Sequence, residues 1–351
     1  MSIDLFAYYL FLIKLVREMY FWYNTHMNIG FLGCSKIGTK VIEAIKSIEG
    51  ATLYGCSARD ALKAKEYKEK YGFLKYYESY EEMLNDPQIE LVYVSTLMTS
   101  HYKDTLLALK HNKSCIVEKS FTMNEKEADE LCFYSEKHNI FLCEAIWTRY
   151  MPSKNVIKKI LKDDTIGEVF HIEANLSYPL KDVERLTNKN LGGGILLDCG
   201  VYPINFVTMF FGYDFLNISS EMIINSKFDV EESVLINMTY KSGLTATLYT
   251  SMNALTSKKG IIYGTKGYLE IDDINNPKKV SIFKTTNEYY PKLIDTIKFK
   301  EEVNGYEYEF IEVINAIKNH QIEPDSMLHS ETLKIMRILD EIRKNASKVY
   351  K

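Results

Sequence analysis

The sequence predicts an α/β protein in which a doubly wound parallel sheet is followed by an α+β domain with a mostly antiparallel sheet. From Met27 to Ala145, buried-type strands alternate with helices of about 10–15 residues, as in parallel βαβ units. Beyond Trp147, strand-like runs follow one another across short turns, as in antiparallel sheets. The chain has 351 residues, enough for two domains.

In the first half, strands and helices alternate in order. A helix is expected after each of the first four strands, the second of these helices ending near Tyr71, and Ser79 with Glu82 has capping-box spacing for an additional short helix. Strands are expected at 28–32, 52–57, 90–96, 114–119 and 140–145.

In the second half, a helix is expected to begin near Pro152, and two amphipathic helices close the chain near 305–319 and 331–345. Turn signals such as "YKSG" and "GTKG" join several of the strands between them. Strands are expected at 168–178, 232–240, 244–252, 260–265, 267–272 and 280–283.

Composition and charge narrow the class of protein. The formal net charge is −4, so no basic surface for nucleic acid is expected. The six cysteines lack CxxC spacing and sit in apolar runs, which favours buried free thiols in a reducing cytoplasm. His171 and Glu173 alternate on an expected strand, but no third ligand lies near them, so no metal site is expected.

Residues 1–26 form an N-terminal extension of unknown role. Its apolar run "LFAYYLFLI" is shorter than the ~20 residues of a membrane span, so no span is expected. The basic start and small-residue cleavage site of a signal peptide are also missing. Two interpretations stay open: a helix that packs on the body or on a partner, and an upstream extension of a protein whose natural start is Met27.

The segment "GCSKIG" follows the first expected strand and opens the first helix. In this context a G-x-G-x-x-G loop presents free N–H groups of a helix N-terminus to a pyrophosphate. Here a serine replaces the middle glycine, so the motif alone is a weak signal, and a tight turn between strand and helix is the alternative. The cofactor interpretation selects Gly33, Ser35, Lys36, Ile37 and Gly38.

The end of the second strand bears on the choice of cofactor. A carboxylate that binds the ribose of NAD is expected roughly 20 residues past the loop, where this sequence reads "CSARD". Ser57 and Arg59 suit the 2′-phosphate of NADP, since arginine grips phosphate with two N–H groups. NADP is therefore favoured over NAD, which stays possible because Asp60 could reach a ribose rather than merely begin a helix.

Two further stretches carry groups suited to chemistry. "CIVEKS" places Glu118 and Lys119 at the carboxyl end of a parallel strand, the edge where ligands bind in open α/β sheets. "LGGGILLDCGVYP" carries Asp198 and Tyr202 at i and i+4, on one face of a helix. Each has a structural alternative: a charge pair at a strand end, and a buried tyrosine beside a carboxylate acceptor.

Motifs over about 27–343 together resemble the glucose–fructose oxidoreductase/inositol dehydrogenase (Gfo/Idh/MocA) family, most of all its dihydrodiol dehydrogenase and NADP-dependent xylose dehydrogenase branch. The resemblance implies a Rossmann domain at 27–146 and a substrate-binding domain at 147–351, whose large open-faced sheet pairs in a homodimer. The motifs are "MNIGFLGCSKIG", "SARDALKAKEYKEKYG", "STLMTSHYKDTLLALKHNKSCIVEKS", "EAIWTRYMP", "LGGGILLDCGVYP" and "IYGTKGYLEI".

The resemblance also implies roles for single residues. Lys119 matches the family's catalytic lysine, and Asp198 with Tyr202 matches its Asp-x-x-x-(His/Tyr) pair. The cofactor site is implied to include Thr96, His101, Glu118, Trp147 and Arg149. The chain departs from the family pattern at Ser120, where the family has proline, at "TLM" in place of "TPN", and at Asn205, where some branches carry histidine.

The implied activity is hydride transfer between a nicotinamide and a carbinol of a sugar, polyol or cyclic diol. A free tyrosine has a pKa of ~10, which a nearby ammonium lowers. The hypothesis is that Tyr202 is the acid/base, Lys119 tunes it and binds the reacting hydroxyl, and Asp198 orients substrate or lysine.

Further substrate contacts and other functions stay open. Tyr178 is a candidate substrate residue, with Arg185 and Asn175 as weaker ones. The alternative functions are a non-catalytic nucleotide-sensing regulator, or a redox-neutral NAD-dependent glycosidase or epimerase of the same fold.

Overall fold

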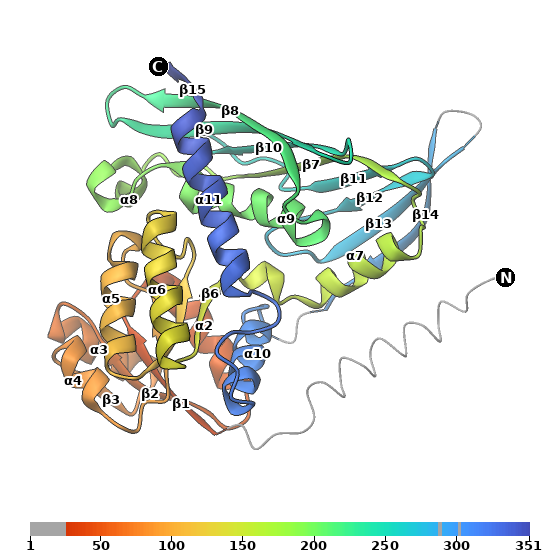
Figure 1. The fold of residues 1–351 in the computed structure, drawn as a ribbon. Coiled ribbons are helices and arrows are strands. Elements are labelled where there is room, and N and C mark those ends of the chain that lie inside the picture. The colour runs from red at the N-terminus through yellow and green to blue at the C-terminus, as the bar shows by residue number, and fades with distance from the viewer. Residues whose placement is uncertain (1–25, 287–289, 301–302) are drawn as a thin grey trace.

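The computed structural model describes residues 26–286, 290–300 and 303–351, so the expected extension lies almost entirely outside the described residues. In the described part, one unit of parallel strands with helices on both faces lies against a second unit built on a larger sheet (Figure 1). The helix drawn in dark blue, α11 (His329–Asn345), runs from the large sheet down to the first unit and packs on both.

The first sheet is parallel throughout and confirms the doubly wound prediction. Its order is β3-β2-β1-β4-β5-β6, so the order in which strands are added reverses between β1 and β4, where ligand crevices form in such sheets. The strands are β1 (Met27–Leu32), β2 (Ala51–Ser57), β3 (Lys75–Tyr77), β4 (Leu91–Val94), β5 (Ser114–Glu118) and β6 (Leu142–Ala145). The helices are α2 (Lys36–Ser47), α3 (Ala61–Tyr71), α4 (Tyr80–Asn85), α5 (Met98–Lys110) and α6 (Glu125–His138).

Side-chain caps explain where several of these helices begin. Ser79 Oγ accepts from Glu82 N at 3.1 Å, as the capping-box spacing predicts, although the Glu82 carboxylate returns to Glu78 N. Asn124 caps α6 in the same way through Glu127 N. At the far end of α3, Gly72 adopts φ +82°, the left-handed conformation that ends many helices.

The second sheet has nine strands in the order β14-β13-β12-β11-β7-β10-β9-β8-β15. Strands β7 and β10, and β8 and β15, pair in parallel, while the other pairs are antiparallel, which confirms a mostly antiparallel sheet. The strands are β7 (Val169–Ser177), β8 (Phe215–Asn225), β9 (Val230–Tyr240), β10 (Thr245–Ser251), β11 (Gly260–Gly264), β12 (Gly267–Ile271), β13 (Lys279–Thr285), β14 (Pro291–Lys298) and β15 (Ser347–Tyr350).

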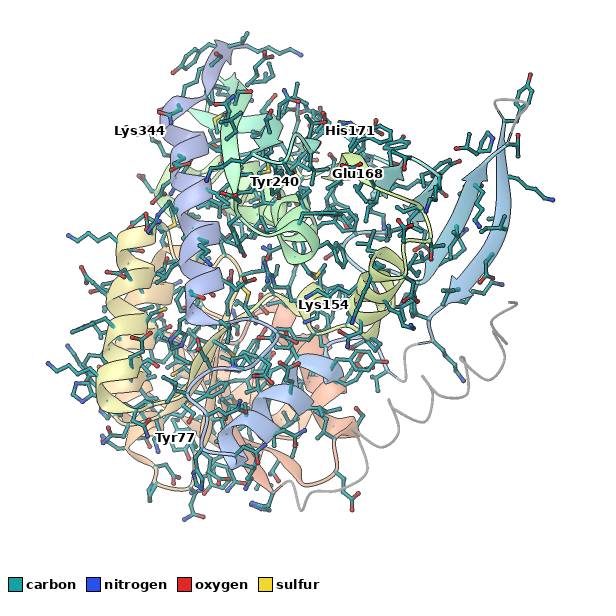
Figure 2. The ribbon with its side chains drawn as sticks, turned by 45° about the vertical axis from the view of Figure 1, so that its right-hand side comes forward. Tyr77, Lys154, Glu168, His171, Tyr240 and Lys344 are labelled. Atoms are coloured by element: carbon teal, nitrogen blue, oxygen red, sulfur yellow. The ribbon has the colours of Figure 1, made fainter. Side chains whose placement is uncertain are left out.

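Helices close the second unit on the side that faces the first. Figure 2 shows Lys154 of α7 between the units, Tyr240 in the large sheet and Tyr77 at the far end of the first unit. Although it lies within 147–351, α10 packs against α2 of the first unit. The helical segments are η1 (Trp147–Arg149), α7 (Pro152–Lys162), α8 (Glu184–Thr187), η2 (Lys189–Leu191), η3 (Leu196–Gly200), α9 (Val201–Phe211) and α10 (Glu307–Lys318).

The segment around Asp198 differs from the expected helix. η3 is a turn of π-helix, and α9 follows directly after it. The i, i+4 argument assumed a regular α-helix, and a π-turn is wider, so it rotates Asp198 relative to Tyr202. A Cβ on Gly200 would lie 3.0 Å from the Leu196 side chain and 3.3 Å from that of Thr250, so glycine here lets the wide turn pack on β10.

This helical stretch belongs to the protein core. Lys189–Phe211 is apolar enough to cross a membrane by composition, but 83% of its most apolar window is buried inside the protein. The six cysteines are buried and free, as the sequence predicts.

Candidate active site

The turn between β1 and α2 has the local structure of a phosphate-binding loop. Ser35 Oγ caps α2 by accepting from Gly38 N at 3.1 Å. Gly33 has φ +104°, and a Cβ there would lie 2.9 Å from a backbone nitrogen after β4, while a Cβ on Gly38 would lie 2.6 Å from the Tyr67 hydroxyl. Both glycines are therefore needed for close packing at the start of α2. The first-turn N–H groups and the exposed Lys36 form a donor set that fits a pyrophosphate.

Of the polar residues at the end of β2, Ser57 and Asp60 serve the fold, and Arg59 is exposed. Ser57 is fully buried, and its hydroxyl donates to Tyr77 O at 3.2 Å, so it serves the sheet. Asp60 caps α3 by accepting from Leu62 N at 2.9 Å, the helix-starting role that the sequence left open. Arg59 between them is exposed. Its guanidinium is the group at this strand end that is free to meet a phosphate.

His101 joins the loop after β4 to the turn after β5. Its Nδ1 lies 3.0 Å from Ser120 O and its Nε2 lies 3.2 Å from Thr96 O. Burial lowers the pKa of His101 to about 4, so the ring is neutral and only one of its nitrogens can donate. Ser120 Oγ donates to Leu197 O at 2.7 Å. This set of contacts holds the turn that carries Lys119 against η3.

Three residues that the sequence selected lie together and form the Lys119 cluster: Lys119 directly after β5, Asp198 of η3 and Tyr202 of α9. Lys119 Nζ donates to Asp198 O at 2.6 Å and to Asp198 Oδ1 at 3.1 Å. The same nitrogen lies 5.3 Å from the centre of the Tyr202 ring, within cation–π range. Burial pushes the pKa of Asp198 up, but Lys119 and Arg185 outweigh it and bring this pKa to about 2, so the carboxylate is ionised.

Tyr202 departs from the sequence argument about its proton. The side chain is 8% exposed, and burial raises its pKa well above the usual range, helped by Tyr306, Glu118 and Asp198. Lys119 Nζ lies over the ring, and the described contacts of Lys119 include no hydrogen bond to the hydroxyl. The phenol is therefore protonated at neutral pH, and the expected lowering by the ammonium is outweighed.

The three glycines before η3 each meet a different neighbour. Gly192 has φ +77°, and its Cβ would lie 3.0 Å from the Met98 side chain at the start of α5. A Cβ on Gly193 would lie 2.8 Å from Leu186 O, and a Cβ on Gly194 would lie 2.2 Å from Glu231 Oε1. The segment therefore passes close to the first unit, to its own loop and to β9, and only a chain without side chains fits there.

Trp147 and Tyr178 are connected through hydrogen bonds to Asn275. The Trp147 ring stacks on Tyr306, with centroids 4.1 Å apart and planes at 6°. Trp147 Nε1 donates to Asn275 Oδ1 at 3.0 Å, and Asn275 Nδ2 donates to the Tyr178 hydroxyl at 3.3 Å. Tyr306 and Asn275 were not selected from the sequence, because they lie more than 120 residues beyond Trp147 with no motif around them.

Arg149 is not brought to the Lys119 cluster. It is 2% exposed and bonds to Asn205 Oδ1 at 2.5 Å, Tyr213 OH at 2.9 Å and Glu331. These partners lie on or after α9 and at the start of α11. Its guanidinium therefore ties two helices together, and its implied place beside a cofactor stays an expectation without a contact in this structure. Asn175, a weaker substrate candidate, lies at a strand edge, where its Oδ1 accepts a hydrogen bond from the backbone of Lys258 at 2.9 Å.

Buried carboxyl groups interact electrostatically with Lys119 or with one another. Glu118 Oε1 accepts from the Tyr93 hydroxyl at 2.6 Å, and burial raises the pKa of Glu118. Burial also raises the pKa of Glu144 to about 7. Glu309 of α10 is fully buried, neither of its carboxyl oxygens has a hydrogen-bond partner among the described residues, and burial raises its pKa well above the usual range. Of these groups, the sequence selected Glu118 alone.

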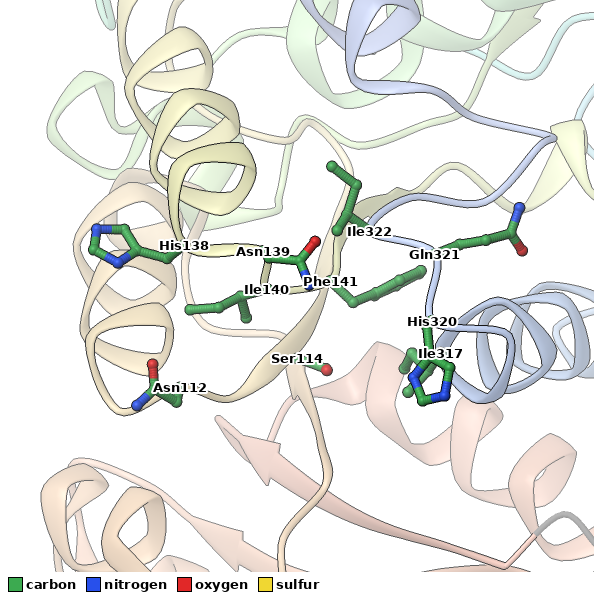
Figure 3. A pocket seen from close by; sticks show the side chains of 10 residues that line it. All are labelled: Asn112, Ser114, His138, Asn139, Ile140, Phe141, Ile317, His320, Gln321 and Ile322. Atoms are coloured by element: carbon green, nitrogen blue, oxygen red, sulfur yellow. The ribbon is translucent and has the colours of Figure 1, made fainter.

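The predicted site lies at the carboxyl edge of the parallel sheet, and its residues line neither of two hollows in the structure. A hollow of about 320 Å³ lies at the opposite edge, beside Ser114 and Phe141, where β5 and β6 begin (Figure 3). A second, of about 440 Å³, lies beside Lys189 and Phe228. Among the described residues, no group of three histidine, cysteine, aspartate or glutamate side chains is arranged to hold a metal ion.

The doubly wound sheet, the phosphate-loop geometry and the Lys119 cluster define a nicotinamide-dependent oxidoreductase. Two family models match: "Oxidoreductase family, NAD-binding Rossmann fold" over residues 27–144 and "GFO/IDH/MocA C-terminal domain" over residues 155–270. The chain belongs to the Gfo/Idh/MocA family, as the sequence motifs predict.

Relatives and solved structures agree with this membership. Trans-1,2-dihydrobenzene-1,2-diol dehydrogenase of Xenopus tropicalis is 28% identical over 92% of this chain and 98% of that protein, and that of Mus musculus is 28% identical over 87% and 92%. KijD10, a 3-ketoreductase from Actinomadura kijaniata in complex with NADP and TDP-benzene, has a TM-score of 0.85 at 21% identity over 93% of this chain and 99% of that chain. Levoglucosan dehydrogenase in complex with NADH has a TM-score of 0.82 at 15% identity over 91% and 96%.

Proposed function

We propose that this chain transfers a hydride between a nicotinamide dinucleotide and a carbinol carbon of a sugar, polyol or cyclic diol. One juxtaposition carries the proposal: Lys119 Nζ lies 3.1 Å from Asp198 Oδ1 and 5.3 Å from the centre of the Tyr202 ring. The cluster follows β5, at the same sheet edge as the phosphate loop after β1. The names of the relatives, diol dehydrogenases at 28% identity, support a carbinol substrate.

The residues divide the chemistry between them. A bound nicotinamide supplies hydride transfer at its ring C4. Tyr202 exchanges the proton with the substrate oxygen, Lys119 donates a hydrogen bond to that oxygen, and Asp198 holds the ammonium in place. Because burial keeps the phenol protonated at neutral pH, Tyr202 is ready to act as the acid in reduction of a ketone. In the oxidative direction it must first lose its proton, so the oxidation rate is expected to increase with pH.

We favour NADP as the cofactor, with NAD as the alternative. Arg59 offers an exposed guanidinium at the end of β2, and the nearest carboxylate, Asp60, already caps α3. A guanidinium binds a 2′-phosphate with paired N–H donors, whereas a ribose hydroxyl is better met by a free carboxylate.

We also propose that two copies pair through the outer face of the large sheet. Aromatic side chains from neighbouring strands contact each other on this face, with Tyr263 and Tyr268 5.7 Å apart and Tyr268 stacked on Phe283 at 4.6 Å. Tyr249 of β10 is 37% exposed. An aromatic surface of this kind is typical of the core of a protein–protein interface.

The proposed activity is tested with the purified protein, NADPH or NADP, and a panel of sugars, polyols, cyclic diols and their ketones. Consumption or formation of NADPH is expected with members of the panel. Lys119→Met and Tyr202→Phe are expected to lower kcat by about 10²–10⁴-fold while cofactor binding is retained. Exposed Tyr290→Phe serves as the control. Folded Lys119→Met and Tyr202→Phe variants with undiminished kcat would contradict the assignment, and a tightly held cofactor without net change would favour a redox-neutral reaction.

A further inference from the structure

Arg185 reaches the same carboxylate oxygen as the proposed catalytic lysine. Its Nη1 lies 3.0 Å from Asp198 Oδ1, and Lys119 Nζ lies 3.1 Å from that atom. The Arg185 side chain is 46% exposed, whereas those of Lys119 and Asp198 are 17% and 11% exposed. One buried carboxylate is thus shared between an inner cation and an outer one.

Two backbone hydrogen bonds fold the loop that carries Arg185 back toward Asp198. Leu186, the next residue, is fully buried, and Gly194 N donates to Leu186 O at 2.9 Å, which closes the loop from α8 to η3. Gly193 N donates to Asn188 O at 3.1 Å, and a Cβ on Gly193 would lie 2.8 Å from Leu186 O. The glycines therefore allow the compact loop that brings the guanidinium back to the carboxylate.

We propose that Arg185 is a positioning residue for the proposed hydride transfer. By donating to Oδ1 of Asp198, Arg185 fixes the orientation of that carboxylate and weakens the attraction between the carboxylate and the Lys119 ammonium. The inference rests on the proposed function of Lys119 and Tyr202. Arg185 is not required to touch the substrate. It acts through Asp198, whose backbone oxygen and Oδ1 both accept hydrogen bonds from the Lys119 ammonium.

Electrostatics gives Arg185 a second, measurable effect. Its charge, added to that of Lys119, leaves the three linked groups with one excess positive charge at the edge of the site. The ionisable groups that act on Asp198, Lys119 or Tyr202 are Glu118 at the end of β5, Glu144 of β6, His101 of α5, Arg185 of α8, Cys199 of η3 and Tyr306 before α10. Removing a cation makes loss of a proton from this cluster harder, whichever member releases it. The rate profile therefore moves to higher pH when the guanidinium charge is removed.

The test compares Arg185→Gln, which removes the charge, with Arg185→Lys, which keeps it. For Arg185→Gln we expect kcat to decrease by about 10-fold, and the pH limb of kcat/KM to move up by about half a unit or more. Arg185→Lys is expected to keep the limb at the wild-type pH. The control is Lys189→Gln in the same segment, because Lys189 pairs with Asp229 rather than with Asp198. An unchanged limb in Arg185→Gln, with only KM increased, would mean that Arg185 binds substrate and would overturn the proposal.

A double-mutant cycle in urea unfolding tests the contact without any turnover. Arg185→Gln and Asp198→Asn together are expected to destabilise the protein by less than the sum of the two single effects. Strict additivity would overturn the contact itself. If the cycle shows coupling but the wild-type protein transfers no hydride to any panel member, the proposed function fails while the Arg185–Asp198 contact stands.

Discussion

At Tyr202, burial and a neighbouring cation have opposite effects on the pKa of the phenol. The sequence argument placed an ammonium near the phenol and expected a lowered pKa. In the structure Lys119 lies over the ring, while burial raises the pKa of Tyr202 well above the usual range. Desolvation prevails because the ring is 8% exposed, and the charges of Glu118 and Asp198 also raise the pKa of Tyr202. The site is therefore poised to give a proton rather than to take one.

Arg59 sets the expected preference between the two dinucleotides. Arg59→Ala is expected to raise the Kd of NADPH by about 10–100-fold, because a hydrogen-bonded charge pair with the 2′-phosphate is lost. The Kd of NADH, which lacks that phosphate, is expected to stay within about twofold. Binding is measured by nicotinamide fluorescence, with exposed Lys70→Ala at the far end of α3 as the control. Equal losses for both dinucleotides would argue against a 2′-phosphate contact.

Glu309 makes stability depend on pH. A carboxyl whose pKa is raised by folding binds its proton more tightly in the folded state. Its contribution to stability is therefore full below the unfolded pKa of ~4.3 and is lost as pH rises toward the folded pKa. Glu309→Gln is expected to increase the free energy of unfolding at pH 8 by about 1–3 kcal/mol, with the gain fading below pH ~4. Urea unfolding at both pH values measures this.

The control for Glu309→Gln is Glu341→Gln, since Glu341 is exposed on α11. A loss of stability in Glu309→Gln at pH 8 would show that Glu309 is ionised and paired, contrary to its unpartnered burial.

At the scale of elements, the segment from α8 to α9 explains the triple glycine. Gly194→Ala is expected to lower the free energy of unfolding by about 3 kcal/mol, because φ is +116° and the new Cβ would lie 2.2 Å from Glu231 Oε1. Gly243→Ala is the matched control: its φ is +90°, but nothing lies within 4 Å, so about 1 kcal/mol is expected. Equal losses in chemical denaturation would show that crowding by Glu231 is unimportant.

The elements that the sequence predicted are those with strong local patterns. The alternation of strands and helices before Trp147 predicted the parallel sheet correctly. Buried strands and capped helices can be predicted from residues close together in the sequence. Strands β3, β8, β14 and β15 were not predicted. β3 has three residues, the middle of β8 is the polar run "NISSE", and β14 is mostly exposed. β15 is fully exposed, and its pairing with β8 defines it as a strand. The π-turn at η3 was not predicted either; in the fold its Gly200 packs on Thr250 of β10, a neighbour that the local sequence does not show.

The proposed site was predictable where local motifs mark single residues. Lys119, Asp198 and Tyr202 come together as the motifs implied. The partners that hold them, such as Tyr306 and Asn275, come from distant segments whose neighbours depend on the tertiary fold. Arg149, two residues from Trp147, lies in the core, so its implied cofactor contact stays a prediction.

At the scale of the whole molecule, the outer face of the large sheet is expected to hold a second copy. Tyr249→Glu places a charge on that face and is expected to convert the dimer to a monomer in size-exclusion chromatography with light scattering. Phe133→Glu, at an exposed position on α6 of the other unit, is expected to leave the dimer intact. A wild-type protein that is monomeric at micromolar concentration would contradict pairing through this face.

Hydride transfer by the Lys119 cluster is tested most directly with NADPH that carries deuterium at both hydrogen positions of C4. With a ketone substrate from the panel, the wild-type protein is expected to place that deuterium on the new carbinol carbon, as detected by mass spectrometry of the product. Lys119→Met and Tyr202→Phe, folded and still binding NADPH, are expected to yield labelled product at rates lower by about 10²-fold or more. Product that carries no deuterium, or labelled product formed at the wild-type rate by both variants, would contradict the account.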